Sequence, residues 1–250
     1  MNNTTISRTK TVITTKSLTK TYGETVVLSA LDLSIDAGEV YGFLGHNGAG
    51  KTTTVSILTT LIAPTSGTAS ICGFDTQKES IEVQKRIGYL PENVKFYDSL
   101  TAYENLEYLA KLSGIDSPKE RIHDVLSFLD FTGVADKKLG EFSKGMRQRI
   151  GIAQAILHEP DVLFLDEPTS GLDPMGIKQL RDIIIKLNTE KGMTIFMNTH
   201  LLSEVAKTCT RIGVLNHGKF IYSDSLQNTM KRFPDESSLE EIYFSLDEAK

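Results

Sequence analysis

Residues 45–52 read GHNGAGKT, a phosphate-binding loop of the form G-x-x-x-x-G-K-S/T. Its glycines allow consecutive backbone N–H groups to turn inward around a phosphate chain, which larger side chains would block. Lys51 can reach the outer phosphates and the Thr52 hydroxyl can coordinate Mg²⁺, so the sequence predicts a site for a nucleoside triphosphate. The residues expected to hold the nucleotide in this loop are Gly45, Asn47, Gly48, Ala49, Gly50, Lys51, Thr52 and Thr53.

A pair of adjacent carboxylates follows a second apolar run. Residues 162–165 are Val-Leu-Phe-Leu, and Asp166 and Glu167 come directly after them. Open α/β sheets bind their ligands at the carboxyl ends of the strands, which is where this pair is expected to lie. Asp166 can hold Mg²⁺ through water, while Glu167 can act as general base toward an attacking water. The alternative, a solvated pair at a strand end, is disfavoured by the phosphate loop in the same chain.

A third string, FSKGMRQR over residues 142–149, suggests a second anion site. Ser143 is placed to cap a helix whose apolar residues fall on one side. The hydroxyl of Ser143, the backbone of Gly145 and the helix N-terminus together could bind an anion. The alternative is a capped amphipathic helix without a ligand. The apolar residues of that helix face are Met146, Ile150, Ala153, Ile156 and Leu157.

With these strings the chain resembles the nucleotide-binding ATPase subunit of ATP-binding cassette (ABC) transporters, over about residues 14–222. The resemblance implies that the signature of one subunit closes over ATP held by the phosphate loop of another, so that two ATP molecules are sandwiched in a head-to-tail dimer. It assigns Tyr22 to stacking on adenine and His200 to sensing the γ-phosphate and positioning the water. The implied signature is Ser143, Lys144, Gly145 and Met146, and the implied D-loop is Ser170, Gly171, Leu172 and Asp173.

Two motifs depart from the family pattern. Glu92 stands where the Q-loop usually has Gln; its carboxylate can still reach Mg²⁺ or the water shell, but an amide donor is lost. Lys144 and Met146 stand where Gly and Gln are commonest in the signature. The implied magnesium ligands are therefore Thr52, Asp166 and Glu92. These variants, with an amphipathic terminal helix around 239–246, are similar to exporter ATPases whose permease is a separate chain.

The elements that must position these residues follow from apolar patterns. Strands are predicted at 31–36, 40–44, 162–165, 194–197 and 212–215, a hairpin turn at 216–218, and a helix from 50 to 62. Alternating strands and helices predict an α/β fold with a mostly parallel sheet, interrupted by an inserted helical subdomain. The resemblance implies that this fold is a P-loop NTPase (RecA-like) core with an antiparallel β subdomain. The expected parts are a flexible N-terminus over 1–13, the core over 14–90 and 161–222, the helical signature subdomain over 91–160, and an extension with a short helix over 223–250.

Composition narrows the function class further. A net charge of −5 over 250 residues gives no electrostatic case for nucleic-acid binding. Cys72 and Cys209 lack metal-ligand spacing and are interpreted as buried thiols in a reducing compartment. The first residues lack the apolar core of a signal peptide, and no run approaches the ~20 apolar residues needed to cross a bilayer. We therefore expect a cytoplasmic protein, peripheral on the inner face of the cell membrane.

The sequence thus favours an ATP-hydrolysing subunit that drives a separate membrane permease, with export as the implied direction. Its expected partners are that permease, docking near residues 91–105 through Phe96 and Tyr97 beside Glu92, and a second copy of itself or a paired homologous ATPase. A soluble cassette ATPase acting as a clamp without a permease remains the alternative. A P-loop kinase is disfavoured, because phosphoryl transfer does not need the signature and D-loop strings.

Overall fold

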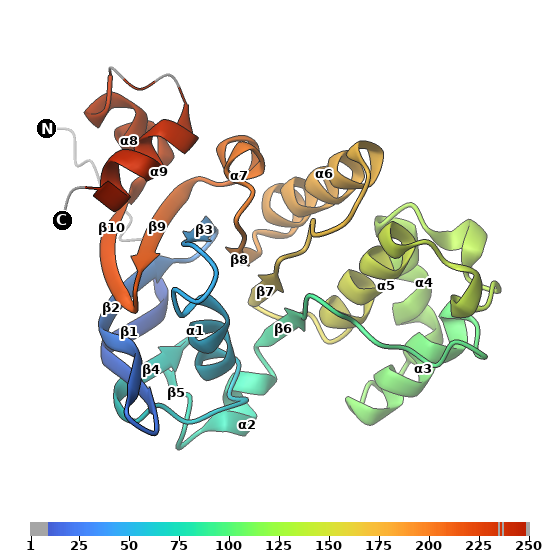
Figure 1. Cartoon of the computed structure of the whole chain (residues 1–250). Helices are drawn as coiled ribbons and strands as arrows, with labels where there is room; N and C mark the ends of the chain where they lie inside the picture. The colour runs from blue at the N-terminus through green and yellow to red at the C-terminus, as the bar shows by residue number, and fades with distance from the viewer. Residues whose placement is uncertain (1–9, 235, 237, 249–250) are drawn as a thin grey trace, which may run out of the picture.

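The two sheets of the core enclose its first helix (Figure 1). The structure is a computed structural model that describes residues 10–234, 236 and 238–248. Helix α1 (Lys51–Leu58) packs against strands of both sheets, and its buried side chains join those of both sheets in one apolar cluster. This arrangement fixes the N-terminal end of α1, which carries the phosphate loop. The α/β prediction with a mostly parallel core sheet is confirmed.

The larger sheet has six strands in the order β10-β9-β3-β8-β7-β6. All neighbouring pairs are parallel except β10 with β9, which form the hairpin predicted at 216–218. Strands β3, β7 and β8 are buried at every position, as expected for parallel strands covered on both faces. The strands are β3 (Val40–Leu44), β6 (Ile87–Leu90), β7 (Val162–Asp166), β8 (Thr194–Asn198), β9 (Arg211–Asn216) and β10 (Lys219–Ser225).

The smaller sheet is antiparallel, in the order β2-β1-β4-β5. Its strands are β1 (Thr11–Tyr22), β2 (Thr25–Asp36), β4 (Ser66–Ile71) and β5 (Phe74–Asp75). The expectation of a flexible segment over 1–13 is wrong for its last residues, because β1 already begins at Thr11 and Ile13 is fully buried. Residues 1–9 lie outside the described part of the chain. The Thr-rich composition of this segment suggests an exposed chain end. The segment is instead ordered as a central strand, because β1 pairs with both β2 and β4.

Helix α1 ends at Leu58, four residues before the end expected at 62. Thr60 adopts a left-handed conformation with φ of +65°. The Thr60 N–H donates to the Ile57 carbonyl and the Leu61 N–H to the Ser56 carbonyl, at 3.1 and 2.8 Å. These two bonds are the Schellman pattern that closes a helix. A glycine usually marks that position, so the threonine hid the helix end from sequence reading.

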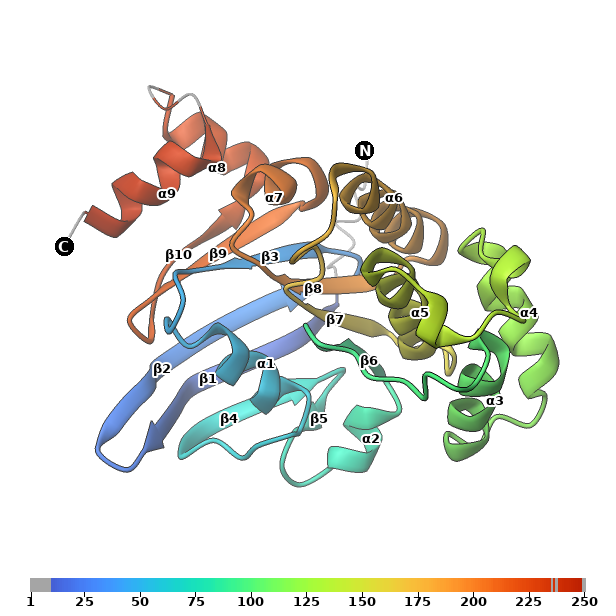
Figure 2. The same ribbon diagram turned by 45° about the vertical axis from the view of Figure 1, so that its right-hand side comes forward.

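The remaining helices cover the core sheet or form a separate lobe on one side of it (Figure 2). Around the core lie α2 (Ser80–Gln84), α6 (Pro174–Lys191) and α7 (Leu202–Thr208). The lobe expected over 91–160 holds α3 (Ala102–Leu112), α4 (Pro118–Phe128), two short 3₁₀ turns and α5 (Lys144–Ile156). Within it, Tyr97 is exposed, but Phe96 is half-buried against the lobe's apolar core. The interpretation of Phe96 as an exposed anchor is therefore wrong.

The chain closes with two helices, α8 (Leu226–Arg232) and α9 (Leu239–Glu248), of which only the second was predicted. Ser238 accepts a hydrogen bond from the Glu241 N–H at 3.3 Å, as its position before α9 suggests. Strand β10 also runs past the expected boundary at 222, to Ser225. The side chains of α9 that pack on the core are those predicted to share one face: Leu239, Ile242, Tyr243 and Leu246.

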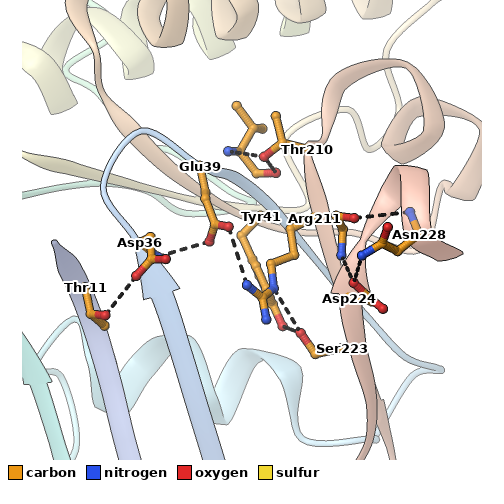
Figure 3. Close-up of polar contacts among 11 residues, drawn as sticks. Thr11, Asp36, Glu39, Tyr41, Thr210, Arg211, Ser223, Asp224 and Asn228 are labelled. Carbon is orange, nitrogen blue, oxygen red and sulfur yellow. Dashed lines mark hydrogen bonds and ion pairs between the residues drawn. The ribbon is translucent and has the colours of Figure 1, made fainter. Parts of the chain in front are cut away.

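A chain of polar contacts links the β2–β3 turn to β9 and β10 (Figure 3). Glu39 accepts from the Asp36 N–H and pairs with Arg211 at 3.6 Å. Arg211 in turn donates to Ser223, whose hydroxyl also contacts the buried Tyr41 hydroxyl at 3.0 Å. Burial raises the pKa of Tyr41 above its ordinary value. The β2–β3 turn, β9 and β10 are thereby held in one polar network on the side of the sheet opposite the phosphate loop.

Two further expectations concern the whole chain. Cys209 is a buried free thiol as expected, whereas Cys72 is only half-buried. Within the residues that the structure describes, none of the helices has the length and apolar character required to span a bilayer.

Candidate functional site

Strand β3 delivers the phosphate loop to the carboxyl edge of the core sheet, where the loop turns between β9 and β2. A Cβ atom on Gly45 would collide with the Leu215 carbonyl oxygen of β9. Gly50, with φ of +108°, has the Val27 carbonyl oxygen 2.8 Å from where a Cβ would stand. Glycine is thus required at both positions, because the loop backbone lies directly against neighbouring strands.

The Lys51 side chain folds back onto the start of the phosphate loop. Its ammonium donates to the carbonyls of Gly45 and His46 at 2.7 and 3.2 Å, and the residue is only 6% exposed. Burial lowers the pKa of Lys51, and the negative charges of Glu167 and Asp166 oppose that shift. The ammonium is therefore held inside the pocket by weak carbonyl partners, from which an anionic phosphate could draw it.

Asp166 ends β7 and lies opposite Asn198 in the parallel register with β8. The Asn198 amide donates to Asp166 Oδ1 at 2.6 Å. Burial raises the pKa of Asp166, while the hydrogen bond from Asn198 lowers it and nearby Glu167 and Glu92 raise it further. A buried carboxylate surrounded by other carboxylates is a favourable place for a cation.

Glu167 is held in an uncommon backbone conformation, with φ of +46°. Its N–H donates to the Asn198 carbonyl at 2.8 Å, and its Oε2 lies 2.7 Å from His200 Nδ1. A left-handed non-glycine residue costs free energy, and such residues are concentrated at functional sites. The Glu167 side chain is 13% exposed, so most of it is shielded from bulk solvent where it lines the pocket.

These groups converge on one pocket of about 440 Å³, within the range of small-molecule sites. Nine sequence-predicted residues line it, and Val27 of β2 joins them although no sequence signal marked it. Gly45, Ala49 and Asp166 are buried beside this lining, whereas Tyr22 lies outside it and is half exposed. The predicted residues that line the pocket are Asn47, Gly48, Gly50, Lys51, Thr52, Thr53, Glu92, Glu167 and His200.

Glu92, at the position expected for the Q-loop, reaches the pocket from the segment that follows β6. Its Oε1 accepts a hydrogen bond from the Ser170 hydroxyl at 3.4 Å. The Q-loop position and the D-loop are therefore in direct contact, which the sequence did not indicate. Glu92 therefore contacts Ser170 while it also lines the pocket.

The signature residues line a different pocket, of about 420 Å³, together with most of the D-loop. Ser143 caps α5 by accepting from the Met146 N–H at 3.3 Å, and Asp173 caps α6 by accepting from the Gly176 N–H at 2.9 Å. Two helix N-termini thus meet here, beside the ammonium of Lys144. Among the residues that the structure describes, none lines both this pocket and the phosphate-loop pocket. The predicted residues that line it are Ser143, Lys144, Gly145, Met146, Gly171, Leu172 and Asp173.

The donor set of the phosphate-loop pocket fits a hard cation that also takes ligands from a substrate. Thr52, Asp166 and Glu92 offer only oxygen atoms, which Mg²⁺ prefers. In the described part of the chain, no group of three or more His, Cys, Asp or Glu side chains could hold a metal ion alone. A magnesium ion here would therefore depend on phosphate oxygens for the rest of its coordination.

Comparisons with known proteins agree with this geometry. A family model described as "ABC transporter" matches residues 28–170. The bacitracin transport ATP-binding protein BcrA of Bacillus licheniformis is 44% identical over 222 residues, which cover 89% of this chain and 72% of that protein. A solved ATP-binding subunit of an ABC transporter is 29% identical, with a TM-score of 0.83 over 94% of this chain and 99% of that chain. A bacterial ABC transporter cassette, solved as a dimer, is 28% identical, with a TM-score of 0.76 over 86% of this chain and 98% of that chain.

Proposed function

The chain belongs to the ABC transporter family, and we propose that it is the ATP-hydrolysing subunit that drives a separate permease chain. Nucleotide binding and hydrolysis are the activities of this family, and the dimeric relative is also known in a post-hydrolysis state with ADP and phosphate. BcrA is named for bacitracin transport, which supports a transport role for this chain. Export is the proposed direction, since the variant signature and the α9 helix resemble exporter ATPases.

The separation of the two pockets is the observation that carries the proposed mechanism. The phosphate-loop pocket contains Lys51, Glu167 and His200, whereas the signature residues face a different pocket of the same chain. An ATP in the first pocket therefore lacks the signature unless a second subunit supplies it. Head-to-tail pairing of two subunits completes two such sites at once, with ATP as the ligand that holds them together.

Within each site the chain's own residues have distinct tasks. Lys51 and the loop N–H groups bind the phosphates, and Tyr22 stacks on the base. Glu167 takes the proton of the attacking water, with His200 at 2.7 Å from its Oε2 to orient it. Thr52, Asp166 and Glu92 would hold Mg²⁺, which neutralises charge on the phosphates when bound. Loss of the γ-phosphate removes the bridge between the subunits and lets them separate.

The proposed permease contact lies on the lobe, where exposed apolar side chains gather. Tyr97 and Tyr108 are 57% and 47% exposed and contact each other edge to face, and Leu112 on the same helix as Tyr108 is 68% exposed. Aromatic side chains of this kind are common anchors in protein interfaces. The inner face of the cell membrane is the proposed place of work, because a permease must be reached from the side that holds ATP.

Gentle affinity purification from native membranes tests the proposal. We expect a multi-spanning protein to be recovered with this chain in stoichiometric amount. Recovery without any membrane partner, with ribosomes or DNA or alone, would instead favour a soluble cassette ATPase acting as a clamp. Tyr97→Ala should abolish recovery of the permease while leaving basal ATP hydrolysis within about 2-fold. Phe244, on α9, is also an exposed aromatic side chain, at 60%, so Phe244→Ala is the matched control and should leave recovery of the permease unchanged.

A further inference from the structure

Asn198 is a fully buried amide at the end of β8, and sequence reading did not include it in the site. It stands opposite Asp166 in the parallel register between β7 and β8. It comes two residues before His200, and the Thr199 between them is also buried. A buried polar side chain at this place needs a reason, because an apolar residue would pack there without any unmet hydrogen bond.

Two different atoms of Asn198 contact the two neighbouring carboxylate residues. Its side-chain Nδ2 donates to Asp166 Oδ1 at 2.6 Å. Its main-chain oxygen accepts from the Glu167 N–H at 2.8 Å, which helps to hold the left-handed backbone of Glu167. One residue therefore fixes the direction of the Asp166 carboxylate through its side chain and the position of Glu167 through its backbone.

The orientation of the amide follows from the charge of Asp166. Asn198 Oδ1 is buried and has no hydrogen-bond partner in the described part of the chain. Turning the amide over would place that oxygen against the Asp166 carboxylate, so two acceptors would face each other and the donor would be lost. The amide is therefore held with its N–H toward Asp166, although its oxygen stays unsatisfied. The fold tolerates this unsatisfied oxygen while keeping the contact to Asp166.

We infer that Asn198 is a positioning residue for magnesium binding, whose side-chain amide holds the Asp166 carboxylate in the orientation that the metal needs. This inference rests on the proposed function, since it concerns the same site. Partners of this kind behind a metal ligand commonly change metal affinity by ~10–100-fold when they are removed. The backbone contact to Glu167 does not depend on the side chain. A substitution should therefore affect metal binding more than the hydrolysis step.

Asn198→Leu tests this, because it keeps the size of the side chain and removes only the amide. In the presence of a non-hydrolysable ATP analogue, binding of Mn²⁺ measured by electron paramagnetic resonance should weaken ~10-fold. The Mg²⁺ concentration that gives half-maximal ATP hydrolysis should rise by a similar factor, so the rate loss at low Mg²⁺ should exceed the loss at saturating Mg²⁺.

Asn188→Leu is the matched control. The Asn188 amide donates to the carbonyls of Gly38 and Met193, at 2.8 and 2.9 Å, at the opposite edge of the sheet. Its loss should leave Mn²⁺ affinity unchanged even where it lowers stability. Asn198→Ala removes the same donor without adding apolar bulk, and it replaces Asn198→Leu if that variant does not fold.

Unchanged Mn²⁺ affinity in a folded Asn198 variant would overturn the inference. Equal rate losses at low and saturating Mg²⁺ would also overturn it, because they indicate a general structural defect. The proposed function fails separately, and visibly, if the unsubstituted chain neither binds Mn²⁺ with the ATP analogue nor hydrolyses ATP in Mg²⁺.

Discussion

The phosphate-loop pocket and the signature pocket of this protein differ in what one chain supplies to each. In the first, Lys51, Glu167 and His200 already hold one another or the loop by hydrogen bonds of 2.7 Å. In the second, two helix N-termini lie beside Lys144, and the carboxylate of Asp173 is engaged as the cap of α6. The first pocket thus carries the proposed groups for hydrolysis, and the second carries groups suited to binding an anion. The difference supports the proposal that the signature pocket of a second subunit completes the phosphate-loop pocket of the first.

Removing the base should have the largest effect on the first pocket. Glu167→Gln should slow ATP hydrolysis by ~100-fold or more, because the proposed general base is gone, while ATP still binds. A single-turnover assay with radiolabelled ATP measures the rate, and equilibrium dialysis measures binding. Glu190→Gln, on the exposed face of α6, is the control for loss of a carboxylate and should leave both values unchanged. If Glu167→Gln hydrolysed ATP at the wild-type rate, Glu167 would not be the general base.

Substitutions in the two pockets should differ in their effects on ATP binding and on ATP hydrolysis. Lys51→Ala should lower both ATP binding and hydrolysis by ~10-fold or more, because the phosphates lose a buried cation. Gly145→Asp should lower hydrolysis by ~10-fold or more and leave ATP binding by the monomer intact, since it repels a phosphate only in the closed pair. A Cβ on Gly145 meets nothing closer than 3.9 Å, so the fold should accept it. Loss of monomer binding in Gly145→Asp would contradict this separation.

Much of the first pocket was predictable because its residues occur in strings of fixed spacing after buried strands. Lys51 and Asp166 needed no knowledge of the fold, only of a loop and a strand end. Asn198 and Val27 could not be found in this way, because their places depend on strand pairing and loop contacts made at long range. Phe96 was misjudged for a related reason: packing of the lobe, not local polarity, decides which aromatic side chain is covered.

Substitution of Tyr22, which lies outside the phosphate-loop pocket, should have a smaller effect on ATP binding. Tyr22 is 50% exposed and lies outside the lining residues, so it has room to stack on a base. Tyr22→Ala should weaken ATP binding by ~1 kcal/mol, or about 5-fold, and Tyr22→Phe should bind normally because stacking needs only the ring. Fluorescence titration with a labelled nucleotide measures both. Equal losses in the two variants would indicate a role for the hydroxyl instead of stacking.

The buried charge of Asp166 should lower the stability of the metal-free protein, and Asp166→Asn tests this. Because burial raises the pKa of Asp166 in the folded state, the contribution of this carboxyl group to wild-type stability is greatest below its unfolded pKa and falls as pH rises through its folded pKa. Asp166→Asn lacks this fall, so the metal-free variant should be the more stable protein at pH 7, within the ~0.5–3 kcal/mol span of single substitutions. Urea unfolding between pH 4 and 8 measures the difference, which should vanish at the acid end. A less stable variant at pH 7 would show that the charge is well compensated.

The central claim is that two subunits complete each other's ATP sites. Its most direct test is the mass of the Glu167→Gln protein in solution with and without ATP. Sedimentation at saturating ATP and Mg²⁺ should give a dimer that reverts to a monomer when the nucleotide is removed, and Gly145→Asp in the same background should prevent the dimer. A Glu167→Gln protein that stays monomeric at saturating ATP would contradict the account, because its two pockets would then never meet across a nucleotide.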